Sequence, residues 1–343
     1  MAFKNKIALV TGSAGFIGYH TAKKLLDNGW AVLGIDCLSD YYDVELKKTR
    51  QNKLLEYEQY TVYNEYLEKP NFLYETFSKY KPELVIHLAA QAGVRYSIDN
   101  PRSYLESNIV GVFELLEAAR AFPPEHMMMA STSSAYGANT SMPFEETQKA
   151  DHQMSFYAAT KKANEIMAHS YSHLYGLPIT MFRFFTVYGP WGRPDMALFK
   201  FTKAIREGKS IDVYNNGKMR RDFTYIDDLV QAIFLLASRI PGRSESKSLI
   251  ENRLDSLSPV APHRIVNIGN SQMVELLDFI NEIELYLKCA AEKNMMPMQA
   301  GDVKETSANT DLLFELTKFK PNTSVRTGIR KFVDWYLEYY HQK

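Results

Sequence analysis

The sequence predicts an α/β fold, a doubly wound parallel sheet of the Rossmann type followed by a smaller C-terminal substrate-binding domain. Three observations predict it. Short apolar runs alternate with amphipathic stretches in the first half of the chain, a glycine-rich turn follows the first of these runs, and the regularity breaks after Pro190. Strands that alternate with helices form a parallel sheet, whose ligands bind at the carboxyl ends of its strands.

Five apolar runs have the length of buried strands, with helical patterns between them. They are Ile7–Val10, Val32–Ile35, Leu84–Leu88, Met127–Ala130 and Ile179–Phe184. We expect residues 1–189 to form the first domain, to which the chain returns near 224–270, and residues 190–343 to form mainly the substrate domain. Residues 241–262 are rich in serine, proline and charge. This composition predicts a surface loop without chemistry.

The composition is typical of a globular protein with no net charge. Of the 343 residues, 45% are hydrophobic, and 40 Lys and Arg balance 40 Asp and Glu. We therefore expect neither nucleic acid nor an anionic membrane as a partner. Two cysteines, Cys37 and Cys289, are too few for a disulfide framework. With no signal peptide and no apolar run of about 18 residues, the sequence predicts a cytoplasmic protein.

A glycine-rich turn joins the first strand to the first helical pattern. Its residues are Gly12, Ser13, Ala14, Gly15, Phe16, Ile17 and Gly18. Glycines in such a turn let backbone N–H groups approach a pyrophosphate, which the helix N-terminus also favours. Asp36 ends the second strand, where a carboxylate accepts hydrogen bonds from a ribose diol and opposes a 2′-phosphate. The turn therefore predicts NAD rather than NADP; the alternative is glycines that only permit close packing.

Tyr157 and Lys161 lie four residues apart in a helical pattern and therefore project from one face. A tyrosine has a pKa of about 10, too high for a base at neutral pH. One positive charge about 4 Å away is worth about 4 kcal/mol at an effective dielectric near 20, enough to bring the phenol pKa near neutrality. We expect Lys161, together with an oxidised nicotinamide, to supply that charge. Taken alone, the same spacing is typical of a solvated helix face.

Thr132 follows the apolar run Met127–Met129 and is the third member of the predicted catalytic group. Its hydroxyl is expected to share the substrate proton with Tyr157. A cluster of serine and threonine after a strand is also typical of a turn whose hydroxyls cap backbone groups. The glycine turn, the threonine and the tyrosine–lysine pair agree with one geometry, and this agreement favours the catalytic interpretation.

With these features the chain resembles the extended short-chain dehydrogenase/reductases and, more narrowly, the UDP-glucuronate 4-epimerases. The narrower resemblance rests on long motifs that extend over nearly the whole chain. They are HLAAQAGVRYS at 87–97, RFFTVYGPWGRPDM at 183–196, RRDFTYIDD at 220–228, PMQAGDV at 297–303 and FVDWY at 332–336.

The resemblance implies roles for further residues. Beside the glycine turn, Asp36, Tyr157 and Lys161, the cofactor is expected to contact Leu88, Ala89, Ala90, Gln91, Asn108 and Phe184. The sugar is expected to contact Arg95, Ser133, Ser134 and Gln299. The uronate carboxylate would lie near Thr186 and Arg193. The UDP pyrophosphate and ribose would be bound by Arg221 and Asp302, since a buried diphosphate needs charge-assisted donors.

The chain departs from the resemblance where relatives usually carry an aspartate near the adenine. Tyr66 stands there, within the segment 64–68. Either Glu65 or Glu68 replaces the aspartate, or the tyrosine ring stacks on the adenine. The sequence leaves these alternatives open.

The resemblance implies an NAD-dependent C4 epimerisation through a 4-keto sugar, with Thr186 and Arg193 holding the carboxylate so that it is not lost. A dehydratase is disfavoured because Ser133 and Ser134 stand where such enzymes place an acidic pair, and Ser134 also disfavours a decarboxylase. An epimerase of another UDP-hexose, an N-acetylhexosamine or its uronate, and a silent nucleotide-sugar-binding protein remain alternatives.

The resemblance also implies a homodimer, formed through helices around 105–119 and 158–171, although the same apolar stripes are consistent with ordinary core. The eight histidines lack a paired ligand spacing, and His87 at a strand end is expected to be packed rather than metal-bound. We therefore expect no metal site.

Overall fold

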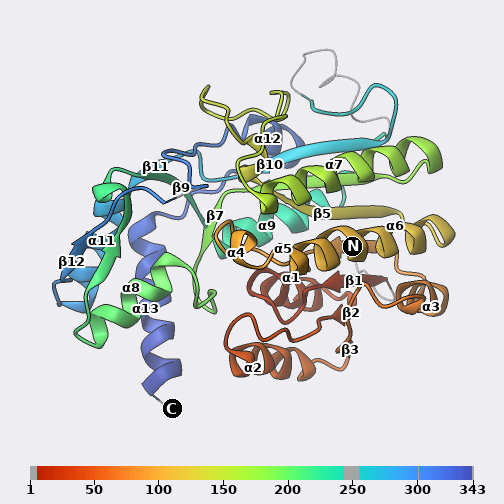
Figure 1. The fold of residues 1–343 in the computed structure, drawn as a ribbon. Coiled ribbons are helices and arrows are strands. Elements are labelled where there is room, and N and C mark those ends of the chain that lie inside the picture. Colours follow the sequence, from red (N-terminus) through yellow and green to blue (C-terminus); the bar gives the residue numbers. More distant parts are fainter. Residues whose placement is uncertain (1–5, 243–254, 300, 342–343) are drawn as a thin grey trace.

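The structure is a computed structural model that describes residues 6–242, 255–299 and 301–341. Of the predicted surface loop 241–262, residues 243–254 lie outside the described part. The predicted doubly wound parallel sheet is confirmed. A seven-stranded sheet with the order β10-β6-β5-β4-β1-β2-β3 forms the larger part of the molecule, and every neighbouring pair in it is parallel (Figure 1).

The seven strands of this central sheet are β1 (Ile7–Thr11), β2 (Ala31–Ile35), β3 (Tyr60–Tyr63), β4 (Leu84–His87), β5 (His126–Thr132), β6 (Ile179–Phe184) and β10 (His263–Ile268). The sequence predicted five of them. It did not predict the two edge strands. Strand β3 is only four residues long, and three of the six residues of β10 are polar, namely His263, Arg264 and Asn267. Strand β5 extends two residues beyond its predicted end and includes Ser131 and Thr132.

Helices cover both faces of the central sheet. One face packs against α1 (Phe16–Asp27) and α9 (Ile226–Leu236), and the other against α3 (Phe72–Tyr80), α6 (Gly111–Ala121) and α7 (Phe156–Tyr175). Alternate residues of β1 enter the two cores, with Ala8 and Val10 on the first face and Leu9 on the second. This period of two is expected for a strand buried on both sides. Helix α2 (Val44–Leu55) packs beside α1.

A second, smaller part of the molecule lies beside the carboxyl ends of the strands (Figure 1). It contains the sheets β11-β9-β7 and β12-β8. Its strands are β7 (Thr186–Tyr188), β8 (Ile211–Val213), β9 (Arg220–Tyr225), β11 (Met273–Glu275) and β12 (Lys293–Met295). Its helices are α8 (Ala197–Arg206), α11 (Leu276–Leu287) and α13 (Val325–His341).

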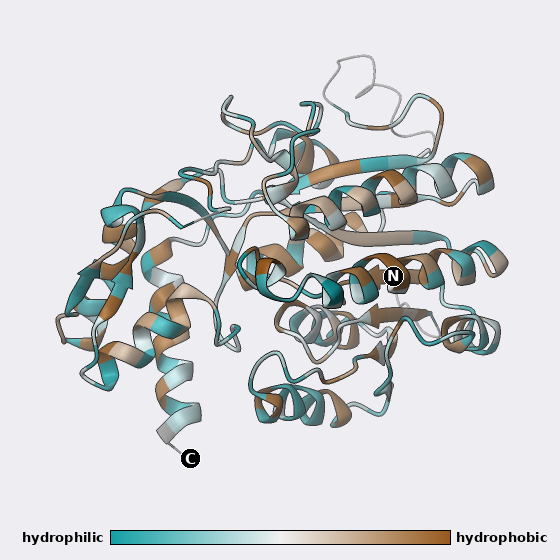
Figure 2. Cartoon of the chain, viewed as in Figure 1, coloured by the Kyte–Doolittle hydropathy of each residue, from teal (hydrophilic) through white to brown (hydrophobic). Residues whose placement is uncertain are grey.

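The remaining helices are short: α4 (Tyr96–Asp99), α5 (Pro101–Tyr104), the π-helix Leu105–Val110, two 3₁₀ helices at Ser133–Tyr136 and Tyr214–Gly217, and α12 (Asp311–Thr317). Apolar residues concentrate on the inner sides of helices and on the strands, and polar residues face outward (Figure 2). None of the helices in the described residues is both long and apolar enough to cross a membrane.

Candidate active site

The glycine turn between β1 and α1 leaves no room for side chains at its three glycines, Gly12, Gly15 and Gly18. Gly12 has a φ of +71°, and a Cβ there would lie 2.8 Å from the backbone nitrogen of Ala89. A Cβ on Gly18 would lie 1.9 Å from the carbonyl oxygen of Gly12. Helix α1 begins at Phe16 without a side-chain cap from Gly15, so its first N–H groups are free to bind an anion. This backbone cradle fits a pyrophosphate.

Asp36 lies directly against this turn, as the sequence predicted for a ribose-binding carboxylate. One of its oxygens accepts a hydrogen bond from the Ala14 amide at 3.0 Å, and the other accepts one from the Leu38 amide at 2.8 Å. Each oxygen keeps a further lone pair for a ligand hydroxyl. Near the predicted adenine position, Glu65 is paired with Lys69 and the Tyr66 side chain is half exposed.

Thr132, Tyr157 and Lys161 come together at the carboxyl end of β5. Thr132 is the last residue of that strand, and its hydroxyl lies near enough to the Tyr157 phenol to lower the pKa of that phenol. Helix α7 begins one residue before Tyr157, where the Ser155 hydroxyl accepts a hydrogen bond from the Ala158 amide at 3.1 Å. The cap sets the start of the helix and thereby the direction of the tyrosine.

The pKa of Tyr157 is set by several groups around it. Burial raises the pKa of the phenol, whereas the neighbouring Thr132 hydroxyl and the charge of Arg193 lower it. Lys161 is buried and donates a hydrogen bond to the Ala130 carbonyl at 2.9 Å, and burial lowers the pKa of its ammonium to about 8. The contribution of Arg193 could not be predicted from the motif spacing, because Arg193 is far from Tyr157 in the sequence.

Asn108 fixes the segment that follows β4. It is fully buried in the π-helix Leu105–Val110. Its side-chain oxygen accepts a hydrogen bond from the Gln91 amide at 2.8 Å, and its side-chain nitrogen donates to the Gln91 carbonyl at 3.0 Å and to the Thr160 hydroxyl at 3.1 Å. The expected cofactor-lining residues are thereby tied to the catalytic helix. Local π-helix is frequent at functional sites.

The other residues expected to line the cofactor lie at the same edge of the sheet. Leu88, Ala89, Ala90 and Gln91 follow β4 and are half buried, and Phe184 ends β6 and is buried. His87 is buried, as predicted, with its Nδ1 2.8 Å from the Thr11 hydroxyl. In the part of the chain that the structure describes, no group of three or more His, Cys, Asp or Glu side chains could hold a metal ion.

Three of the residues expected to bind the substrate meet, although they come from distant parts of the chain. Arg95 and Arg221 both approach Asp302, at 3.3 Å and 3.9 Å respectively. Arg221 also donates a hydrogen bond to the Lys304 carbonyl at 2.9 Å. Burial lowers the pKa of Arg221. Two guanidinium groups beside one carboxylate leave a net positive charge, which suits a diphosphate.

Gln299, Ser133 and Ser134 lie in half-buried positions. The side-chain oxygen of Gln299 is buried and accepts no hydrogen bond within the described residues, so it is available to a ligand donor. Ser133 and Ser134 open the 3₁₀ helix after β5, and the Ser134 amide donates to the Thr132 hydroxyl at 3.1 Å. The sequence predicted these positions beside the catalytic threonine.

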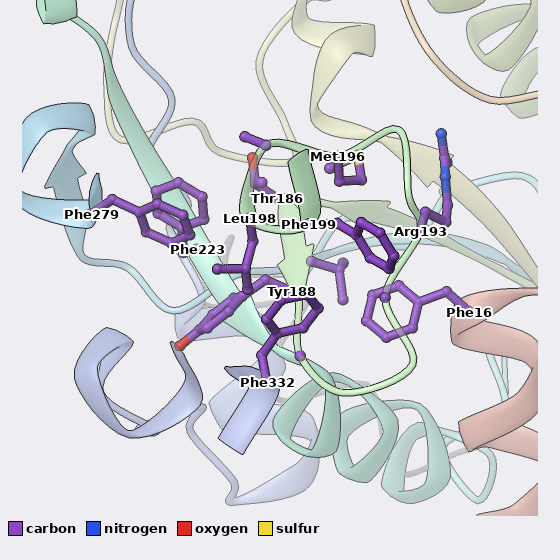
Figure 3. A pocket seen from close by; sticks show the side chains of 14 residues that line it. Phe16, Thr186, Tyr188, Arg193, Met196, Leu198, Phe199, Phe223, Phe279 and Phe332 are labelled. Atoms are coloured by element: carbon purple, nitrogen blue, oxygen red, sulfur yellow. The ribbon is translucent and has the colours of Figure 1, made fainter. Parts of the chain in front are cut away.

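Thr186 and Arg193 line an apolar pocket between the two parts of the molecule (Figure 3). Phe16, Phe199 and Phe332 form much of the wall, and the guanidinium of Arg193 points away from these rings. Arg193 thus contributes to the pocket wall while its charged end lies outside the cluster of rings.

Arg193 is held by Asp195, which is in turn bound by Tyr41, and neither residue was predicted from the sequence. The Asp195 carboxylate accepts hydrogen bonds from two guanidinium nitrogens, one of them Nε at 3.0 Å. The Tyr41 hydroxyl donates to the same carboxylate at 3.2 Å. Asp195 lies in the motif at 183–196 and could have been considered on that ground. Tyr41, in the loop after β2, carried no signal in the sequence.

A buried ion pair anchors the catalytic helix, and the sequence analysis missed it as well. Glu165 of α7 accepts from Arg183 of β6 at 2.9 Å and 2.8 Å, in a bidentate arrangement. Ser131 of β5 donates to the same carboxylate at 2.7 Å. Burial alone would raise the pKa of Glu165, but the hydrogen bonds and charge of Arg183 lower it to about 2.

Comparisons with known proteins agree with this geometry. The sequence profile of the family described as "NAD dependent epimerase/dehydratase family" matches residues 8–246. A probable UDP-glucuronate 4-epimerase of Rhizobium meliloti (strain 1021) is 52% identical over 97% of this chain and 98% of its own length. Protein CapI of Staphylococcus aureus is 54% identical over 97% of this chain and 98% of its own.

Solved structures are similar as well. The UDP-glucuronic acid 4-epimerase of Bacillus cereus, in complex with UDP-glucuronic acid and NAD, has a TM-score of 0.86 and 30% identity and covers 97% of this chain and 100% of that chain. A UDP-glucose 4-epimerase of Thermotoga maritima, with UDP-glucose, has a TM-score of 0.84 and 28% identity and covers 97% of this chain and 99% of that chain.

Proposed function

Because the chain belongs to the NAD-dependent epimerase/dehydratase family, we propose that it interconverts UDP-glucuronate and UDP-galacturonate by inverting C4. The observation that carries the proposal is that Tyr157, on which the Thr132 hydroxyl and the charge of Arg193 both act, lies on a helix that Lys161 ties to β5, two strands from the strand that ends in the dinucleotide-binding turn. A proton-transfer group and a carboxylate-binding cation at one place suit oxidation and reduction of a uronic acid.

The residues of the turn and Asp36 would hold NAD, with Asn108 and Lys161 on the nicotinamide side. Bound there, NAD would supply the hydride acceptor for C4 of the sugar and the hydride for the return step. Tyr157 takes the proton of the C4 hydroxyl, and the Thr132 hydroxyl keeps the phenol oxygen directed at that proton. The resulting 4-keto sugar turns about its pyrophosphate linkage, while Arg221 and Asp302 hold the UDP. Tyr157 then returns the proton to the C4 oxygen, while the returning hydride would enter on the opposite face of C4 and so invert that carbon.

The proposal is tested by separate incubations with UDP-glucuronate, UDP-N-acetylglucosamine and UDP-glucose, with each product identified by NMR. We expect UDP-galacturonate from the first and little turnover of the others. Turnover confined to another UDP-sugar would overturn the choice of substrate. No turnover of any of them, together with no absorbance change near 340 nm, would indicate a silent binding protein.

Replacing Arg193 by Met should raise the KM for UDP-glucuronate and produce a UDP-pentose. The 4-keto uronate is a β-keto acid, which loses carbon dioxide when its carboxylate aligns with the ketone π-system. A charge-assisted hydrogen bond is worth about 1.5–3 kcal/mol, so the KM should rise about 10-fold to 100-fold. The measurement is chromatographic separation of epimer and pentose, with Arg193→Lys as the charge-preserving control. An unchanged KM and product ratio in Arg193→Met would contradict the proposed role.

We also infer a homodimer formed through the π-helix, α6 and α7. Large apolar side chains on these helices are exposed in the single chain, among them Phe113 at 46%, Ile166 at 62% and Leu174 at 63%. Large exposed apolar side chains on neighbouring helices support an interface there. In sedimentation experiments the wild type should be a dimer and Ile166→Glu a monomer. Leu285→Glu, on α11 and also 62% exposed, is the matched control and should remain a dimer. A monomeric wild type would overturn the inference.

A cytoplasmic location is proposed from the cysteines. Cys37 and Cys289 are both free thiols, and free thiols persist in reducing compartments.

A further inference from the structure

A fully buried arginine of α2 joins the glycine turn to the loop that follows β7. Arg50 has 0% exposure. Its Nη1 donates hydrogen bonds to the Ala14 carbonyl and the Tyr42 hydroxyl, each at 3.0 Å. Its Nη2 donates to the Trp191 carbonyl at 2.6 Å and the Gly192 carbonyl at 3.4 Å. One planar guanidinium therefore holds two backbone segments that are far apart in sequence.

The loop that Arg50 holds has an unfavourable backbone conformation. Trp191 has a φ of +62°, which is costly for a residue with a side chain. Its ring packs against Tyr19 of α1 and Trp335 of α13, with centroids at 5.7 Å and 5.2 Å. His20 Nε2 lies 3.0 Å from the Pro190 carbonyl, and burial lowers the His20 pKa to about 4, so the neutral ring donates there. Such a conformation persists only where its surroundings enforce it.

We propose that Arg50 is a positioning residue, which sets the place of Arg193 relative to the dinucleotide turn. Arg193 follows Gly192 directly, so the carbonyls bound by Arg50 fix the start of its side chain. On the other side, the Ala14 carbonyl accepts from Arg50, and the amide of the same residue donates to Asp36. The predicted ribose-binding carboxylate and the predicted uronate-binding cation are thus linked through Arg50 and the backbone of Ala14.

The fork shape of the guanidinium is essential to this role. All four acceptors of Arg50 are uncharged, three carbonyls and a phenol, so the group is held by geometry rather than by an ion pair. A lysine ammonium keeps the charge but cannot reach both segments from one plane. Displacement of a substrate-orienting group by about 1 Å can cost about 100-fold in rate. Where the substrate is a uronate, as proposed above, such a displacement also changes how often the keto intermediate loses its carboxylate.

The test compares Arg50→Met and Arg50→Lys with Arg264→Met in NAD-saturated protein. Arg264 is also fully buried but pairs with Asp255, in the region of β10 away from the glycine turn, and so controls for the loss of a buried guanidinium. The first readout is hydrogen exchange of the peptide 189–196. The second is the ratio of UDP-pentose to UDP-galacturonate formed from UDP-glucuronate, with KM and kcat.

Arg50→Met should speed exchange in 189–196 by about 5-fold or more. It should also raise the pentose ratio by about 10-fold or more, while Arg264→Met leaves both unchanged. Arg50→Lys should keep the fold and still show faster exchange and a higher pentose ratio, each to a smaller extent. This variant therefore tests the proposal if Arg50→Met does not fold. Wild-type exchange and product ratio in the Lys variant, or equal changes in Arg264→Met, would overturn the proposal. If the wild type makes no UDP-galacturonate, the proposed function fails, and the exchange measurement still tests Arg50.

Discussion

Tyr157→Phe is expected to lower kcat for C4 inversion by about 10²-fold to 10⁴-fold, the range that a positioned acid–base group supplies. The phenol is the group that takes the C4 hydroxyl proton and returns it. The neighbouring Thr132 hydroxyl cannot take over this role, because it has no basic group to activate it. Phenylalanine keeps the ring that contacts Tyr104 at a centroid distance of 6.0 Å, so the packing is preserved. Product formation from UDP-glucuronate and transient absorbance near 340 nm measure the effect.

The matched control is Tyr175→Phe, at the exposed end of the same helix, which should retain wild-type turnover. Both variants should retain NAD, measured as nucleotide released on acid precipitation. If Tyr157→Phe inverts UDP-glucuronate at a rate similar to wild type, the assignment of the proton-transfer group is wrong.

Glu165→Gln is expected to lower the free energy of unfolding by about 3–5 kcal/mol, because it leaves the Arg183 guanidinium buried without its counter-charge. The ion pair also makes stability depend on pH. The folded pKa of Glu165, about 2, lies below its ordinary value of 4.5. Its contribution is therefore fully present above about pH 4.5 and is lost as the pH falls toward 2. Urea unfolding at pH 7, 4.5 and 3 measures both effects.

The Glu165→Gln variant should lack this pH-dependent contribution. The difference in free energy of unfolding between wild type and variant should therefore become smaller as the pH falls. Glu45→Gln provides the control, since its pair with Lys48 at 2.8 Å is exposed and should change stability by less than about 1 kcal/mol. Equal loss of stability in the two variants at pH 7 would show that the buried pair has no special role.

The sequence predicted the parallel sheet because buried strands leave a local signature. Runs such as Ile7–Val10 are apolar throughout, and the glycine turn between a strand and a helix limits what can follow. Strand β10 has no such signature. Arg264 and Asn267 point inward with hydrogen-bonding partners that come from elsewhere in the fold. A buried arginine in a strand is indistinguishable by composition from an exposed one.

The residues of the candidate site likewise include some that could be predicted from the sequence and some that could not. Tyr157 and Lys161 could be proposed from the sequence because their spacing of four residues places them on one face of a helix, and Thr132 because it directly follows a buried strand. Arg50 and Glu165 could not be, because each is an ordinary charge on a helix until the fold brings neutral carbonyls or Arg183 to it. The effect of Arg193 on the Tyr157 pKa could not be predicted for the same reason, because the two residues are far apart in the sequence. Lys161 is near Tyr157 in the sequence, and its ammonium donates a hydrogen bond to the Ala130 carbonyl.

The anchoring of α7 bears on how both halves of the reaction take place. Lys161 ties the helix to β5, and Glu165 ties it through Ser131 and Arg183 to β5 and β6. Because the helix is fixed at two successive turns, the phenol oxygen stays at the same place before and after the 4-keto sugar rotates. All reorientation then falls to the substrate, and the forward and return transfers need no second protein conformation between them.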